Sequence, residues 1–280
     1  MAARWVVGID GSDAAVDALR WAVAHGDQHG ARITALGAFH VPAIMAVFTA
    51  KRGFGVDELG LEATAGHDVD TAIEAAGGSG VEASVVEGQP QHVLVDAAAD
   101  ADLLVLGRTG SGDLRLHLLG SVSRYCVTHS TVPVVVVPPG PPSGSVGSIV
   151  VGVDGSEPSL DALRWALDFA DDSATVRAVA AIEVAPWVDL DLTRHVFGNE
   201  IDEEEQRIRA SLDAVDPDGR AERSIVLNGP REALAEAQSG ADLVVVGTRG
   251  RGLVAAGLIG SVSTWLLHEA TVPVAVVPSR

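Results

Sequence analysis

Short apolar runs alternate with longer segments of helical periodicity along the whole chain. The first run, Trp5 to Asp10 (WVVGID), is apolar up to a final aspartate and predicts a buried strand. Ser12 or Asp13 then offers a helix cap, because either side chain can accept a hydrogen bond from the first turn. The residues that follow have the spacing of one buried helix face: Ala15, Ala18, Leu19, Ala22 and Val23.

The same alternation of strands and helices continues to the end of the chain. Further strands are predicted at 32–41, 81–87, 103–106 and 134–137, and then near 148–153, 175–184, 221–227, 243–247 and 273–277. Helices are predicted at 61–76, from Pro90, at 121–129 and from Pro230, since the first turn of a helix tolerates proline. The segment 42–60 lacks a clear period and is predicted as a loop.

The chain is a tandem repeat of two halves. The first motif recurs as Ile149 to Asp154 (IVVGVD), and each half closes with Val-Pro-Val-x-Val-Val-Pro, at 132–138 and at 272–278. The segment between the halves is rich in Pro, Gly and Ser, which is typical of a linker. We therefore predict two domains joined by a linker, with these boundaries: 1–138, 139–147 and 148–280.

Strands that alternate with helices predict parallel sheets covered on both faces and joined by right-handed crossovers. In such sheets, ligands bind beyond the carboxyl ends of the strands, where the strand order reverses. Asp10, Val41 and Gly107 lie at the ends of three predicted strands of the first half. We therefore expect one ligand-binding crevice in each half.

A glycine-rich loop follows one buried strand in each half. In the first half the spacing is Gly107-x2-Gly110-x9-Gly120-Ser121, and the second half repeats it from position 247. Glycine turns let main-chain amides approach an anion, and a helix N-terminus adds unpaired donors and a positive dipole end. One such turn is often only a turn, whereas two copies at identical spacing favour a phosphate site.

The composition restricts how such an anion is held. The chain has 19 basic and 38 acidic residues, a net charge of −19, which disfavours nucleic acid and anionic membranes as partners. An anionic ligand therefore needs a local site built from main-chain amides, a few arginines or Mg²⁺. Lys51 is the only lysine, and no lysine-bearing P-loop motif occurs.

The sequence also indicates a cellular compartment. No apolar run approaches the ~18 residues of a membrane helix, and the first residues, MAARWVVGID, enter a strand without the long apolar region of a signal peptide. Cys126 stands alone, which excludes an internal disulfide and a cysteine-based zinc site. These features predict a cytoplasmic protein.

The motifs V-G-[IV]-D-G-S, the glycine loop and VPV-x-VVP occur in this order in both halves, and together they resemble the universal stress protein family. The resemblance covers nearly the whole chain in a tandem form. It implies an α/β fold of two Rossmann-like domains of the adenine nucleotide alpha hydrolase-like type. Each would be a five-stranded parallel sheet of order 3-2-1-4-5 flanked by helices. It also implies ATP as the ligand, with Mg²⁺, because family members with this glycine pattern typically bind ATP.

The resemblance further implies a set of ligand-contacting positions. The loop glycines and the serine at the helix start hold the phosphates, and Asp10 and Asp154 lie near the ribose and the metal. Gly8 leaves room for the nucleotide, and Val41 contacts the adenine through its backbone. In the second half, Ala185 takes the position of Val41. In the first half the set is Gly8, Asp10, Val41, Gly107, Arg108, Thr109, Gly110, Ser111, Gly112, Gly120, Ser121, Val122 and Ser123. In the second half it is Gly152, Asp154, Ala185, Gly247, Thr248, Arg249, Gly250, Arg251, Gly252, Gly260, Ser261, Val262 and Ser263.

Several polar residues near these loops have two interpretations. Arg108, Arg249 and Arg251 either neutralise phosphate charge or are solvated loop residues, and the sequence favours neither. His117 has a glycine at the equivalent place in the second half, which argues against a catalytic base, and His40 is expected to pack. No Ser/His/Asp order, metal motif or paired-carboxylate spacing recurs in both halves, so the sequence favours binding over turnover.

We therefore predict an ATP-binding protein of the stress response that changes shape or partner with its nucleotide state. One alternative is a slow ATPase or a nucleotidyl- or phosphotransferase on the same fold, and another is a scaffold whose glycine loops are only structural. The closing Val-Pro-Val-x-Val-Val-Pro strands are predicted as sheet edges. In the resembling family such strands often mediate pairing, so the two halves, or two chains of a homodimer, are expected to meet there.

Overall fold

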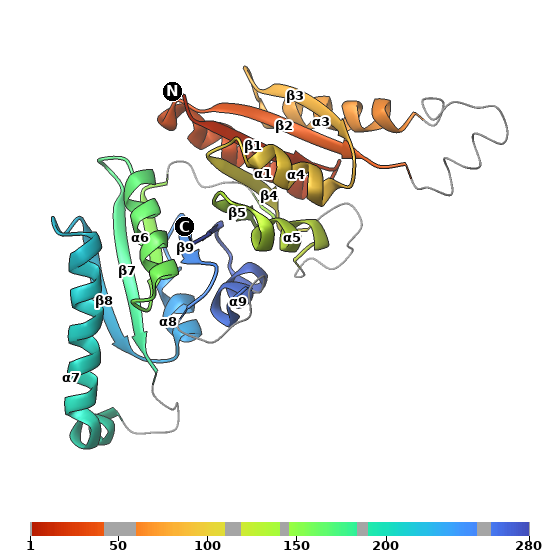
Figure 1. Cartoon of the computed structure of the whole chain (residues 1–280). Helices are drawn as coiled ribbons and strands as arrows, with labels where there is room; N and C mark the ends of the chain where they lie inside the picture. The colour runs from red at the N-terminus through yellow and green to blue at the C-terminus, as the bar shows by residue number, and fades with distance from the viewer. Residues whose placement is uncertain are drawn as a thin grey trace. The chain divides into compact units, whose positions relative to one another are not determined.

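The computed structural model describes residues 2–41, 60–109, 119–140, 146–183, 190–250 and 259–279. The chain divides into two compact units, Met1–Gly144 and Ser145–Arg280. Both units are α/β, with helices that cover a parallel sheet (Figure 1). Among the described helices, none is long and apolar enough to cross a membrane.

The first unit contains a five-stranded parallel sheet. Its strand order is β3-β2-β1-β4-β5, which is the 3-2-1-4-5 order that the family resemblance implies. The strands are β1 (Arg4–Ile9), β2 (Arg32–Phe39), β3 (Glu82–Glu87), β4 (Leu103–Gly107) and β5 (Val134–Val137). The order reverses between β1 and β4, and the carboxyl ends of strands at such a reversal are where parallel α/β sheets bind ligands.

Helices pack on both faces of this sheet. α1 (Asp13–Gly26) and α3 (Leu61–Ala76) contact each other on one face, and α4 (Pro90–Ala98) and α5 (Ser121–His129) contact each other on the other. Ser12 caps α1, because its Oγ accepts the Ala15 amide at 3.2 Å. Between α1 and β2 lies a short 3-10 helix, Asp27–His29.

The second unit repeats this architecture in the order β8-β7-β6-β9-β10. Its strands are β6 (Ser148–Val153), β7 (Thr175–Ile182), β8 (Ala221–Leu227), β9 (Leu243–Gly247) and β10 (Val274–Val277). Its helices are α6 (Glu157–Phe169), α7 (Leu190–Val215), α8 (Pro230–Ala237) and α9 (Ser261–Glu269). α8 and α9 contact each other, as α4 and α5 do.

The core of each unit includes its fourth and fifth strands along the chain. β4, β5, β9 and β10 are buried at every position, as expected for parallel strands covered on both faces. Trp21 of α1 is buried and stacks on Trp5 at a centroid distance of 6.0 Å. The equivalent Trp165 is only half-buried and stacks on Phe169 instead.

Two features distinguish the units. α7 has 26 residues against 16 in α3, and its backbone leaves helical geometry at the exposed Phe197. In the first unit, Asp17 of α1 accepts the amide of Gly140 on its Oδ2 at 2.9 Å. This hydrogen bond ties the chain leaving the first sheet to α1.

Candidate functional site

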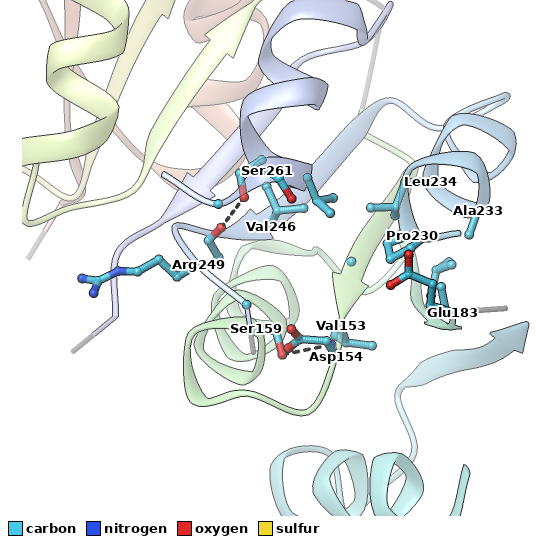
Figure 2. Close-up of a pocket in the computed structure, with 18 residues that line it drawn as sticks. Val153, Asp154, Ser159, Glu183, Pro230, Ala233, Leu234, Val246, Arg249 and Ser261 are labelled. Atoms are coloured by element: carbon cyan, nitrogen blue, oxygen red, sulfur yellow. Dashed lines mark hydrogen bonds between the residues drawn. The ribbon is translucent and has the colours of Figure 1, made fainter. Parts of the chain in front are cut away.

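A pocket of about 290 Å³ opens at the carboxyl ends of β6, β7 and β9 in the second unit (Figure 2). The N-terminal turns of α8 and α9 complete its walls. It lies where the strand order reverses, which is the place where parallel α/β sheets bind ligands. The described lining residues are Gly152, Val153, Asp154, Ser159, Val179, Ala181, Glu183, Pro230, Ala233, Leu234, Val246, Gly247, Arg249, Gly250, Gly260, Ser261, Val262 and Ser263.

One end of the pocket is formed by the start of α9. Gly260 donates its amide to the Thr248 carbonyl at 2.8 Å and closes the turn that brings α9 back to β9. Within the described residues, no side chain caps this helix at Gly260. The first-turn amides of Ser261, Val262 and Ser263 therefore present hydrogen-bond donors and the positive end of the helix dipole.

The first unit builds the same turn. Gly120 donates its amide to the Arg108 carbonyl, also at 2.8 Å, and α5 begins at Ser121. The backbone at Gly120 (φ −60°, ψ 153°) matches that at Gly260 (φ −62°, ψ 156°). As at α9, no side chain in the described part of the unit caps the helix.

The second serine of the Gly-Ser-Val-Ser motif has a different role from the first. Ser263 and Ser123 are buried, and the Oγ of each donates to the carbonyl of the glycine that ends the preceding strand, at 2.8 Å. These hydroxyls join helix to strand and are not directed at a ligand. Ser121 and Ser261 are exposed.

The strand-end glycines are required by packing. A Cβ at Gly107 would lie 2.6 Å from the Ala14 carbonyl oxygen, and one at Gly247 would lie 2.5 Å from that of Pro158. Each glycine thus lets the first helix of its unit approach the fourth strand. Gly8 is less constrained, since a Cβ there would lie 2.6 Å from Leu106 Cδ2, the end of a flexible side chain rather than backbone.

The two aspartates after the first strand of each unit are held alike. Asp10 Oδ1 accepts the Ser12 amide at 3.1 Å and its hydroxyl at 2.6 Å, and Asp154 Oδ1 accepts the same two groups of Ser156. Asp154 Oδ2 lies directly beside Gly250, where a Cβ would overlap it. The carboxylate is therefore oriented toward the glycine loop before any ligand arrives.

The arginines differ in their placement. Arg108 is buried in the first unit. Arg249 lines the pocket, but Figure 2 shows its side chain extending away from the cavity, so its backbone forms the wall. Arg231 of α8, which the sequence motifs do not single out, donates from Nη2 to the Ser261 carbonyl at 3.4 Å. It places a cation beside the start of α9.

The opposite end of the pocket is mostly apolar. It is formed by Leu234, Ala233 and Pro230 of α8 and by the residues of β7 that face them. The motif analysis missed this wall, because α8 contributes no motif of its own. Its sequence signal is the alternation of Val179, Ala181 and Glu183 along β7, since every second residue of a strand shares a face.

The strand register changes one correspondence between the halves. Arg4 pairs with Arg32 in the first unit, whereas Ser148, which matches Arg4, pairs with Thr175. The second half is therefore one residue shorter between its first two strands. His40 thus corresponds to Glu183, and the position matching Val41 is 184 and not Ala185.

The outcome for the remaining predicted positions is mixed. Val41 lies two residues beyond β2 and is half-buried, whereas His40 is exposed and does not pack as expected. Gly110, Ser111, Gly112, Ala185, Arg251, Gly252 and His117 lie outside the described residues. No group of three or more His, Cys, Asp or Glu side chains gathers in a metal-binding arrangement in the part of the chain that the structure describes.

Fold and site define a doubly wound α/β protein in which a glycine turn and the start of a helix form one end of a pocket. The model of the universal stress protein family matches residues 1–138 and 146–278, and the chain belongs to this family.

Relatives support the tandem form. The chain is 34% identical over 221 residues to a universal stress protein of Mycobacterium tuberculosis, covering 74% of this chain and 73% of the relative. It is 31% identical to one from Mycolicibacterium smegmatis, covering 98% and 97% of the two chains. A universal stress protein from Archaeoglobus fulgidus has the same fold over 100% of both chains, with a TM-score of 0.65 at 18% identity.

Proposed function

We propose that each half binds one adenine nucleotide, ATP with Mg²⁺, and that the protein acts as a nucleotide-dependent regulator of the stress response with little turnover. The observation that carries this proposal is the pocket in which the start of α9 meets an apolar wall from α8 and β7. A nucleotide has the matching chemistry, because its phosphates need hydrogen-bond donors and its base needs apolar surface.

The donors at the phosphate end are main-chain amides. In a chain of net charge −19, an anion is repelled at long range and must be held by local donors. The amides of Ser261, Val262 and Ser263 supply these donors, and Arg231 adds a cation next to them. Ser121, Val122 and Ser123 start α5 in the same way.

The residues present fit a magnesium ion. Asp154 turns a carboxylate oxygen toward the glycine loop, where a bound phosphate would otherwise meet a like charge. Magnesium prefers oxygen ligands and is commonly held by one or two carboxylates together with substrate phosphates. Asp154 in the second half and Asp10 in the first would hold it, and the ion would neutralise phosphate charge.

The test removes one main-chain donor and leaves the helix in place. Ser261 is the first residue of α9, where proline is tolerated, and Gly260 before it has the extended conformation that proline requires. Ser261→Pro therefore deletes an amide N–H with little cost to folding. We expect it to weaken Mg·ATP binding at one of two sites by about tenfold, as for the loss of a hydrogen bond to a charged group.

The matched control is Ser261→Ala, which keeps the amide and removes only the hydroxyl. We expect it to bind Mg·ATP like the unchanged chain in isothermal titration calorimetry, and Ser121→Pro and Ser121→Ala to repeat the contrast at the other site. Binding that is equal in the proline and alanine variants would refute the role of the amides. ADP, AMP and cyclic AMP are titrated in parallel, and phosphate release measures turnover.

A further inference from the structure

The apolar end of the second-half pocket finishes in a carboxylate. Val179, Ala181 and Glu183 line the pocket from β7 and the residue that follows it. Figure 2 shows the Glu183 carboxylate beside Pro230, away from Ser261. The pocket therefore has hydrogen-bond donors at one end and an acceptor at the other, with apolar side chains between them.

The first half has a different group at the equivalent position. The register of the first two strands in each unit aligns His40 with Glu183, and both side chains are exposed at the end of their strand. A carboxylate only accepts hydrogen bonds, whereas an imidazole can donate as well. The two halves thus share the uncapped helix start after the glycine turn but differ in the side chain that follows the second strand.

We propose that Glu183 makes the second site select nucleotides whose base presents a hydrogen-bond donor, such as the 6-amino group of adenine, and that the first site lacks this selection. The inference rests on the proposed function, since it concerns the base of the nucleotide bound there. Leu234, Ala233 and Val246 supply the apolar surface against which a flat base can pack.

The selection follows from what happens to the carboxylate when a base covers it. A base with an amino group replaces the water that the carboxylate loses with a charge-assisted hydrogen bond. A base without a donor leaves the carboxylate desolvated and unpaired, which costs more than a missing neutral hydrogen bond. Repulsion between Glu183 and the phosphates is the same for any two triphosphates, so it cancels when they are compared.

The experiment titrates the intact chain by calorimetry with Mg·ATP and with the magnesium complex of purine riboside 5′-triphosphate, which has hydrogen in place of the amino group. We expect one site to prefer ATP by about tenfold and the other by a much smaller factor. Glu183→Leu should abolish the larger preference. Glu183→Gln should keep part of it, because an amide oxygen still accepts a hydrogen bond.

His40→Leu is the matched control in the first half and should leave the larger preference unchanged. Circular dichroism verifies that the variants are folded, as expected for substitutions of exposed residues. If both triphosphates bind two sites and neither site distinguishes them, or if Glu183→Leu leaves the preference intact, the inference is wrong while the proposed function stands. If neither triphosphate binds, the proposed function fails and the inference fails with it.

Discussion

Gly107 ends β4 beneath the first turn of α1, where a methyl group has no space. A Cβ there would lie 2.6 Å from a backbone oxygen, which cannot move without shifting the helix. We expect Gly107→Ala to lower the free energy of unfolding by about 1–3 kcal/mol, the usual cost of overpacking. Urea denaturation followed by circular dichroism measures it.

Gly66 is the control for this substitution. It lies inside α3, and a Cβ there would meet nothing within 4 Å. Gly66→Ala should therefore raise stability by up to about 1 kcal/mol, because alanine loses less conformational entropy in a helix. Equal effects of the two substitutions would contradict the packing role of Gly107.

Ser263 acts through its hydroxyl at a buried position. Its Oγ donates to the Gly247 carbonyl and joins the start of α9 to the end of β9. Ser263→Ala should lower the free energy of unfolding by about 1–2 kcal/mol, since a buried acceptor loses its partner. Ser261→Ala, at an exposed position, should change it by less than about 0.5 kcal/mol. A thermal or urea melt of both variants tests the contrast.

The roles of individual residues in the glycine motif could be predicted from the sequence only in part. The serines and glycines stand out in the sequence because the motif repeats, but its spacing does not separate Ser261 from Ser263. The different roles of the two serines depend on the Gly247 carbonyl. It is 16 residues from Ser263 in the sequence and accepts its hydroxyl only in the folded chain. Glu183 was missed because a shortening of one residue hides its correspondence to His40.

Individual helices and strands followed the sequence pattern closely. The interval 121–129 was predicted as a helix and is α5, because the glycine turn fixes its start and the helix ends at Ser130, which adopts an extended conformation. The strands of both sheets lie where the apolar runs predicted them, except that β2 and β7 end two residues earlier than predicted. The length of α7 and its irregularity at Phe197 were not predicted; Gly198, which directly follows Phe197, is the local sequence signal for a break in the helix.

The buried thiol of α5 gives a test of this helix. Cys126 is fully buried, and burial raises the pKa of its thiol to about 12. It should not react with a disulfide reagent at about pH 8 in the folded protein, and should react once per chain in denaturing urea, because the thiolate is the reactive form. A fast reaction of the folded chain would show that α5 opens readily.

The raised pKa of the Cys126 thiol makes the stability of the folded protein depend on pH. The thiol keeps its proton in the folded state over the interval in which it ionises in the unfolded chain, from the ordinary value of 9.0 up to about 12. Its contribution to stability is complete below about pH 9 and is lost as the pH rises toward 12. Cys126→Ala should make the urea midpoint less sensitive to pH in this interval.

For the whole molecule, pairing through the closing strands stays a prediction. Four residues of β10 pair with β9, and all four are buried, so deletion of residues 272–280 would damage the second sheet itself. Light scattering of the intact chain over a range of concentrations is the better test. A homodimer should give about twice the chain mass of 28.7 kDa. A mass of one chain at every concentration would exclude it.

The hydrogen bond between Asp17 and the Gly140 amide has a mechanical consequence. α1 begins three residues after Asp10, and one turn later Asp17 accepts the amide of Gly140, in the backbone that leads toward the second half. The hydrogen bond therefore fixes the first residues of the connection relative to α1, so that a movement of α1 would also move them.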